Sequence, residues 1–249
     1  MYINDVHILV YVVFAIIGAI VAIFINWCND RMPQKKKIFS KDILDKTKRK
    51  KTNYILIMIM AVLYVILLYF FGIHQGLYKN LNLIKFILLI PMLISALMID
   101  YKFQIIPNRL NLTMFEIGLF LTFLYGITNV NIAINMLLGM VAGGGIFLII
   151  TLFGGLIAGR EAMGFGDVKL MGALGLYFGL SGIIAISLIA FLLGAIISII
   201  LLATKIKKSS EYIPFGPFIV IAALIVLFIP FEILVTILLK VFTLGMYME

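Results

Sequence analysis

Apolar residues dominate this chain in long runs that short polar segments separate. Most runs have the length of about 20 residues at which a helix crosses a bilayer. The sixth run is shorter, and it meets the seventh at Gly179-Leu180-Ser181-Gly182, which favours a tight turn. The pattern predicts an all-α, polytopic integral membrane protein with about eight transmembrane helices. The apolar runs cover residues 7–27, 54–71, 82–99, 110–127, 132–157, 168–180, 181–203 and 214–240.

Composition agrees with this pattern and excludes several other classes of protein. Of the 249 residues, 64% are hydrophobic and 12% are charged, whereas soluble domains are roughly 45–50% apolar and about 25% charged. The chain has one Cys and six Pro, so it is neither a disulfide-rich secreted domain nor collagen-like. Eight spans would use nearly the whole length, which leaves no room for a separate soluble domain.

The basic residues are distributed unevenly between the loops. If the eight runs alternate in direction, 17 of the 20 Lys and Arg residues fall on one side, and ten of them lie in the segment 28–53. The positive-inside rule makes that side cytoplasmic and places both termini outside. The net charge of +9 is therefore mostly that of a cytoplasmic loop suited to anionic lipid. Since the loop has little aromatic content, no nucleic-acid partner is expected.

Two aspartates stand out because both fall at the predicted cytoplasmic boundary. Asp100 ends the third run and Asp167 begins the sixth. Two carboxyls within hydrogen-bond reach share one proton, so that one can act as general base on water and the other as general acid. Glu116, about two turns into the fourth run, is a further candidate, either on a water path or hydrogen-bonded to a neighbouring helix.

The residues around each aspartate leave a second interpretation open. Asp167 lies in Gly164-Phe165-Gly166-Asp167-Val168-Lys169, where a helix start favours a carboxylate, but an Asp there also suits a simple N-terminal cap. Lys169 is expected near Asp167. Asp100 precedes Pro107-Asn108, where Pro107 ends one helix and Asn108 can cap the next, but a solvated carboxylate at a helix end has the same pattern.

Taken together, these segments resemble the type IV prepilin peptidase family of Gly-x-Gly-Asp membrane aspartic proteases. The resemblance rests on Asp100 with Pro107-Asn108, on Gly164 to Met171, and on Ile213-Pro214-Phe215-Gly216-Pro217-Phe218, with a weaker match from Phe24 to Pro33. It covers about residues 91–218. We therefore expect residues 91–249 to form the peptidase core, and residues 1–90 to hold two spans, the basic loop and the start of the third span.

The resemblance implies an activity, a substrate and a location. Members cleave the basic leader from type IV prepilins or pseudopilins, after a Gly, at the cytoplasmic face of the bacterial inner membrane. Asp100 and Asp167 correspond to the catalytic pair, and Gly164, Gly166, Lys169, Pro107 and Asn108 to supporting positions. The peptidase chemistry itself requires no cofactor. Membrane lipid is the other expected partner, and the oligomeric state is left open.

One departure from the family concerns the first cytoplasmic loop. Many members carry two Cys-x-x-Cys pairs there that bind zinc, and many also methylate the new N-terminus with S-adenosylmethionine. This loop contributes Cys28 alone, so no zinc is expected. Methyl transfer is left open, with S-adenosylmethionine needed only if it is retained. Asn26 and Arg31 are carried over as structural or methylation-linked positions.

The sequence lacks the signatures of other membrane proteases. The Gly-x-Ser-Gly at 179–182 would suit a rhomboid serine protease, but His7 and His74 both lie upstream and on the outer side. The chain has no His-Glu-x-x-His of a zinc protease and no Pro-Ala-Leu of a presenilin-like protease. An ion-coupled transporter that uses the same carboxylates is the alternative function.

Overall fold

The fold is given by a computed structural model, which describes residues 2–4, 6–38, 53–74, 76–158, 163–205 and 213–229, together with residues 231, 233, 234, 236 and 240. The chain forms two compact units, Met1–Phe103 and Gln104–Glu249. The boundary between the two units reflects how the helices pack and not a division of function. The functional division expected after residue 90 stays a prediction.

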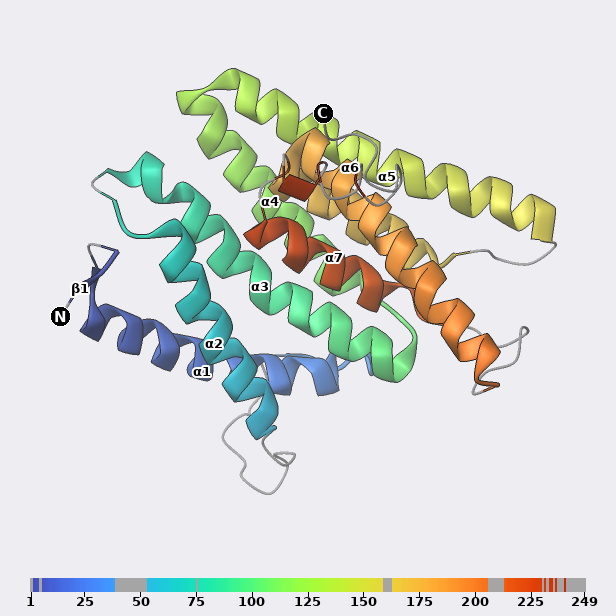
Figure 1. The fold of residues 1–249 in the computed structure, drawn as a ribbon, viewed down its shortest axis with the longest axis horizontal. Coiled ribbons are helices and arrows are strands. Elements are labelled where there is room, and N and C mark those ends of the chain that lie inside the picture. Colours follow the sequence, from blue (N-terminus) through green and yellow to red (C-terminus); the bar gives the residue numbers. More distant parts are fainter. Residues whose placement is uncertain are drawn as a thin grey trace. The chain divides into compact units, whose positions relative to one another are not determined.

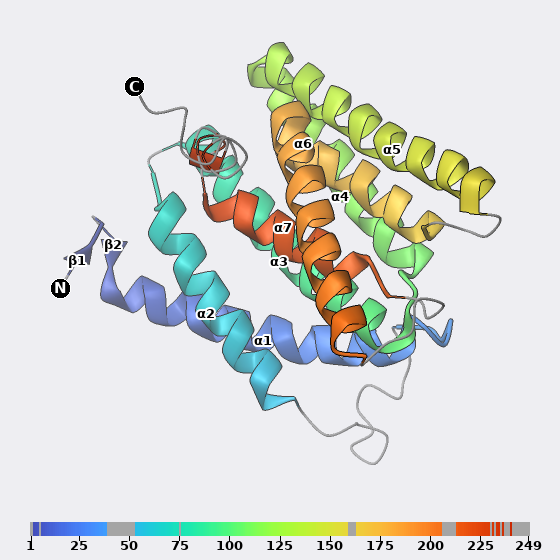
Figure 2. The ribbon, with the colours of Figure 1, turned by 45° about the vertical axis from the view of Figure 1, so that its right-hand side comes forward.

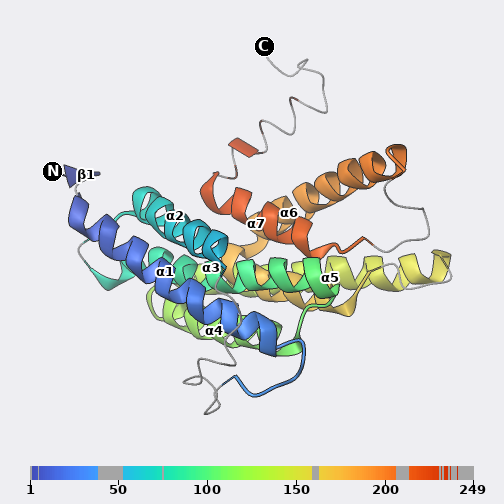
Figure 3. The ribbon, with the colours of Figure 1, turned by 90° about the horizontal axis from the view of Figure 1, so that it is seen from below.

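The first unit is built from three long helices that lie side by side (Figure 1). Gly18 allows the first two to approach closely, because a Cβ at this position would lie 2.7 Å from the carbonyl oxygen of Met60. The Tyr64 hydroxyl donates to the carbonyl of Ile87 at 2.9 Å and ties the second helix to the third. Figure 3 shows the short N-terminal hairpin at the start of the first helix. The elements are β1 (Tyr2–Ile3), β2 (Val6–His7), α1 (Ile8–Arg31), α2 (Tyr54–Phe71) and α3 (Leu77–Phe103).

The second unit holds the remaining helices, in which α5 lies along α6 (Figure 2). α4 packs against both of them, and α7 packs against α6. The ring of Phe215, in the Pro-Phe-Gly-Pro segment, lies tilted at 5.4 Å from the Phe191 ring and 6.0 Å from the Phe147 ring, so aromatic contacts fix the start of α7. The elements are α4 (Asn108–Thr128), α5 (Val130–Ala158), α6 (Phe165–Ala203) and α7 (Gly216–Phe228).

Six of these helices, α1 to α6, are long and apolar enough to cross a membrane. The protein is therefore an all-α, multi-pass membrane protein, as the sequence predicted. The sixth and seventh runs both lie within α6, as two helical segments that meet at a break at Gly179, and α7 covers only part of the last run. Much of that last run and of the basic loop, including residues 39–52, lies outside the described residues. The count of eight spans stays a prediction.

α6 is interrupted where the sequence predicted a turn. Gly179 has φ +68° and ψ −173°, which is not helical, and glycine adopts this conformation without a steric penalty. The side chain of Asn135 on α5 reaches the break, where its Oδ1 accepts the N–H of Leu180 at 3.2 Å. A backbone N–H that the interruption frees is thereby satisfied from the neighbouring helix.

Glycines bring the backbones of α5 and α6 into contact. A Cβ on Gly175 would lie 2.2 Å from the carbonyl oxygen of Gly139, and one on Gly143 would lie 2.5 Å from the carbonyl oxygen of Met171. Gly144 makes a looser contact with Gly172, and a Cβ at Gly145 would meet nothing within 4 Å.

We expect Gly175→Ala to lower the thermal unfolding midpoint of the purified protein in detergent. The new methyl group would meet the backbone of α5, which cannot move away as a side chain can, and such overpacking costs about 1–3 kcal/mol. Gly145→Ala is the matched control. It adds the same methyl group to the same helix pair in open space, so its midpoint should stay or rise slightly. Equal midpoints for the two variants would refute the glycine contact.

Candidate active site

Asp167 lies in the first turn of α6 and is buried, with 3% of its surface exposed. Gly164 is the N-cap residue of this helix, and its carbonyl accepts the N–H of Asp167 at 3.0 Å. Asp167 is therefore not the capping residue, which the simpler interpretation of the sequence required. It stands within the helix start, where unpaired N–H groups favour a negative charge.

Gly166 fits closely against the segment that precedes α4. A Cβ on Gly166 would lie 3.2 Å from the Cβ of Ile106, and so would require Ile106 to shift by a few tenths of an ångström. The turn that presents Asp167 is thus built against the end of the α3–α4 connection, which the sequence marks with Pro107.

Asn111 also holds this turn, and sequence reasoning missed it. Its Nδ2 donates to the carbonyl of Gly166 at 3.0 Å, and the side chain is 4% exposed. Its Oδ1 is buried and has no hydrogen-bond partner among the described residues. The available signal was the spacing of Asn108 and Asn111, which places both on one helix face.

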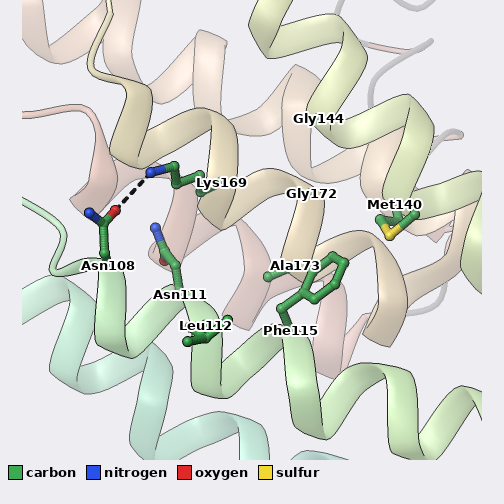
Figure 4. Close-up of a pocket in the computed structure, with 9 residues that line it drawn as sticks. All are labelled: Asn108, Asn111, Leu112, Phe115, Met140, Gly144, Lys169, Gly172 and Ala173. Atoms are coloured by element: carbon green, nitrogen blue, oxygen red, sulfur yellow. Dashed lines mark hydrogen bonds between the residues drawn. The ribbon is translucent and has the colours of Figure 1, made fainter.

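Lys169 and Asn108 meet directly, as Figure 4 shows. The Lys169 Nζ donates to the Asn108 Oδ1 at 2.8 Å. The expectation that Asn108 caps its helix is wrong, since Pro107 is the N-cap residue of α4 and no side chain caps this end. Asn108 is already inside the helix, so its side chain extends sideways to α6.

A cavity of about 560 Å³ opens beside this pair, between α4, α5 and α6. Its polar end is made by Asn108, Asn111 and Lys169, and the side chains of Phe115 and Met140 lie toward its other end (Figure 4). Asp167 does not line it, because residues two apart on a helix point about 200° away from each other. The remaining lining residues are Leu112, Gly144, Gly172 and Ala173.

Asp100 belongs to the first unit, where it lies in the last turn of α3. It is 3% exposed, so it is not the solvated carboxylate at a helix end that the alternative interpretation described. The side chains that follow it in sequence are exposed, with 78% of the surface of Tyr101 and 47% of that of Ile105 accessible. α3 therefore ends with one carboxyl turned inward.

Burial separates these two aspartates from the other described carboxyl side chains. The structure describes four such side chains, those of Asp30, Asp100, Glu116 and Asp167, and only Asp100 and Asp167 are buried. Proteins rarely bury a carboxyl group unless it is paired or hydrogen-bonded, and perturbed groups of this kind are typical of functional sites.

Glu116 is exposed on α4 and does not line the cavity. It makes no hydrogen bond or ion pair with any residue that the structure describes. The expectation that it bonds to a neighbouring helix is therefore wrong for this part of the chain.

The two positions carried over from the N-terminal segment lie near the end of α1, in the first unit. Asn26 is half-buried. The Arg31 guanidinium lies 3.9 Å from the centre of the Trp27 ring and donates to the carbonyl of Lys37 at 2.9 Å. The Arg31 contacts hold the segment after α1 against the end of that helix. Cys28, between them, is buried.

The residues that the structure describes contain no group of three or more His, Cys, Asp and Glu side chains that could hold a metal ion. A pair of carboxyls can activate water and donate a proton without any further group.

Comparison with known proteins gives one family. Residues 87–199 match the model of the Type IV leader peptidase family. A "Prepilin leader peptidase/N-methyltransferase" from Legionella pneumophila is 35% identical over 151 residues, which are 60% of this chain and 51% of the relative. A protein of the same description from Xanthomonas campestris pv. campestris is 37% identical over 132 residues, 52% of this chain and 44% of the relative.

A third such relative, from Aeromonas hydrophila, is 32% identical over 141 residues, 57% of this chain and 48% of the relative. The chain thus spans about half the length of the curated relatives it matches. No solved structure gives a significant match. The matched segment includes both buried aspartates, Asn111 and Lys169, so residues 87–199 are similar to the Type IV leader peptidase family.

Proposed function

We propose that this protein is an aspartic endopeptidase that removes the basic leader of type IV prepilins or pseudopilins. The observation that carries the proposal is the burial of two carboxyls, Asp100 and Asp167, inside the segment that matches the leader peptidase family. The printed names of the relatives add the substrate class, since each is a prepilin leader peptidase.

In the proposed reaction, Asp100 and Asp167 act as one catalytic pair. One carboxylate takes a proton from water while that water attacks the scissile carbonyl, and the other carboxyl donates a proton to the carbonyl oxygen. Because coupled carboxyls titrate as a pair, the roles of base and acid belong to the dyad rather than to either residue. The Gly166 turn and Asn111 would hold Asp167 in place.

The distribution of basic residues supports a location for this reaction. If the eight apolar runs alternate in direction, 17 of the 20 Lys and Arg residues lie on one side. By the positive-inside rule, this split supports a position of both aspartates at the cytoplasmic face of the inner membrane, with both termini outside. Cleavage after a Gly at that face, ahead of the apolar pilin helix, is what the family resemblance implies.

The ion-coupled transporter is not favoured by any observation on the described residues. Such a protein places charge at broken helices near the midplane. The break in α6 at Gly179 carries an amide, Asn135. The carboxyl farthest into a described span, that of Glu116, is exposed and does not line the cavity.

Exchange of either aspartate for its amide should remove leader cleavage. Asp100→Asn and Asp167→Asn keep the size of the side chain but can no longer act as base or acid, which lowers the rate by about 10²–10⁴-fold. The measurement is release of the leader from a synthetic prepilin by each purified variant. Glu116→Gln is the matched control and should cleave normally, since Glu116 lies outside the site. Full activity in either aspartate variant would disprove the dyad.

Asn111 should affect the rate rather than the binding of substrate. Asn111→Leu removes the donor to the Gly166 carbonyl at similar volume, and a neutral hydrogen bond of about 1 kcal/mol corresponds to roughly a fivefold change. We expect kcat to fall by about that factor while KM is unchanged. The control is Asn131→Leu, the same exchange at an exposed position on α5. An unchanged kcat, or equal effects of both exchanges, would contradict the positioning role of Asn111.

Cleavage should proceed without added metal or S-adenosylmethionine. The proposed chemistry requires only two carboxyls and water, and the first loop has a single Cys in place of paired zinc ligands. The measurement is the product mass after incubation with a synthetic prepilin, with and without a chelator. Loss of cleavage with the chelator would refute this. Addition of S-adenosylmethionine to the same assay shows whether the product gains a methyl group.

A further inference from the structure

The cavity between α4, α5 and α6 has a chemistry that differs from that of the carboxyl site. We call it the α4–α6 groove and define it by the nine lining residues given above. It lies wholly within the second unit. Its volume of about 560 Å³ is in the range of sites that hold small organic ligands. Asp167 is not among its lining residues, although the groove adjoins the Asp167 turn through Asn111.

One end of the α4–α6 groove is cationic. Lys169 is exposed and uses one of its three N–H donors on Asn108, at 2.8 Å. It forms no ion pair with any residue that the structure describes. An ammonium group with two unused donors beside two amide side chains is suited to the oxygens of an anion.

The rest of the groove is apolar and extends along the helices. Asn108, Asn111, Leu112 and Phe115 follow one face of α4, and the step from the first to the last is seven residues, or about 10 Å along the axis. Met140 lies on the opposite wall, from α5. All three helices are apolar enough to cross a membrane. The site therefore changes from cationic to apolar in the direction in which a bilayer changes from headgroup to hydrocarbon.

We propose that the α4–α6 groove binds an anionic phospholipid. The phosphate would accept hydrogen bonds from Lys169 and Asn108, and one acyl chain would lie against Leu112, Phe115 and Met140. Basic pockets between transmembrane helices on the cytoplasmic side are suited to such headgroups. The positive charge of Lys169 favours an anionic lipid over the proposed substrate at this site, because it would repel a basic leader. The inference does not depend on the peptidase activity.

The test measures lipid bound to the intact protein. The full chain in detergent is titrated with phosphatidylglycerol or phosphatidylcholine and examined by native mass spectrometry. We expect one phosphatidylglycerol to bind, and phosphatidylcholine to bind at least about tenfold more weakly. Lys169→Gln should weaken the binding of phosphatidylglycerol by a similar factor, as expected for loss of a charged hydrogen bond. The matched control Lys205→Gln, an exposed lysine at the other end of α6, should leave binding unchanged.

A second variant tests the apolar part of the groove. Gly172→Leu introduces a side chain where a Cβ would make only ordinary contacts, the nearest at 3.7 Å from Gly144. The melting midpoint of the variant is measured first. With that midpoint unchanged, the added side chain should displace the acyl chain, so that binding falls without any change of charge. A phosphatidylglycerol with a photoreactive acyl chain should label the α4 peptide around Phe115 in the native chain and not in this variant.

Several outcomes would overturn the proposal. Equal binding of the two lipids, equal loss in both lysine variants, or labelling away from α4 and α5 would each exclude the α4–α6 groove as an anionic lipid site. Displacement of phosphatidylglycerol by a synthetic prepilin, mole for mole, would assign the groove to the substrate instead. Leader cleavage is measured separately, so a failure here is distinguishable from a failure of the proposed function.

Discussion

Backbone contact between α5 and α6 is the constraint on which the second unit depends. Gly139 and Gly175 lie so close that neither position has room for a methyl group. Helices that approach this closely gain dispersion contacts along their whole length, which matters in lipid because no hydrophobic force drives them together. With α6 fixed against α5, the position of its first turn is fixed as well, and that turn contains Asp167.

α4 extends this arrangement to the carboxyl. The Tyr177 hydroxyl donates to the carbonyl of Met114 at 2.8 Å in a buried position, and a Cβ on Gly118 would meet Leu176 at 2.9 Å. α4 is thereby held against the middle of α6, and at its own start Asn111 reaches the Gly166 carbonyl. A buried hydrogen bond between two fixed helices restricts the turn more than a loop contact would.

The sequence predicted the membrane helices and the two special aspartates, but it did not predict the hydrogen bonds that link one helix to another. Apolar runs and the Asp100 and Asp167 segments predicted a membrane protein with two aspartates in special settings, because both signals are local. Asn108 was wrongly expected to cap α4, and Asn111 was missed, because each amide bonds to α6 more than 50 residues away. A pairing of that kind depends on how α4 and α6 pack, and periodicity does not report it.

The interruption at Gly179 has a consequence for the membrane itself. The part of α6 before it, residues 165–178, is about 20 Å long, whereas the hydrocarbon layer is about 30 Å thick. Such a segment is too short to match the bilayer, so lipid must thin around it or the interruption must lie below the surface. If the interruption lies below the surface, Asn135 takes the place of water there. If the lipid thins instead, the carboxyl at the start of α6 lies closer to the opposite leaflet than a full span would place it.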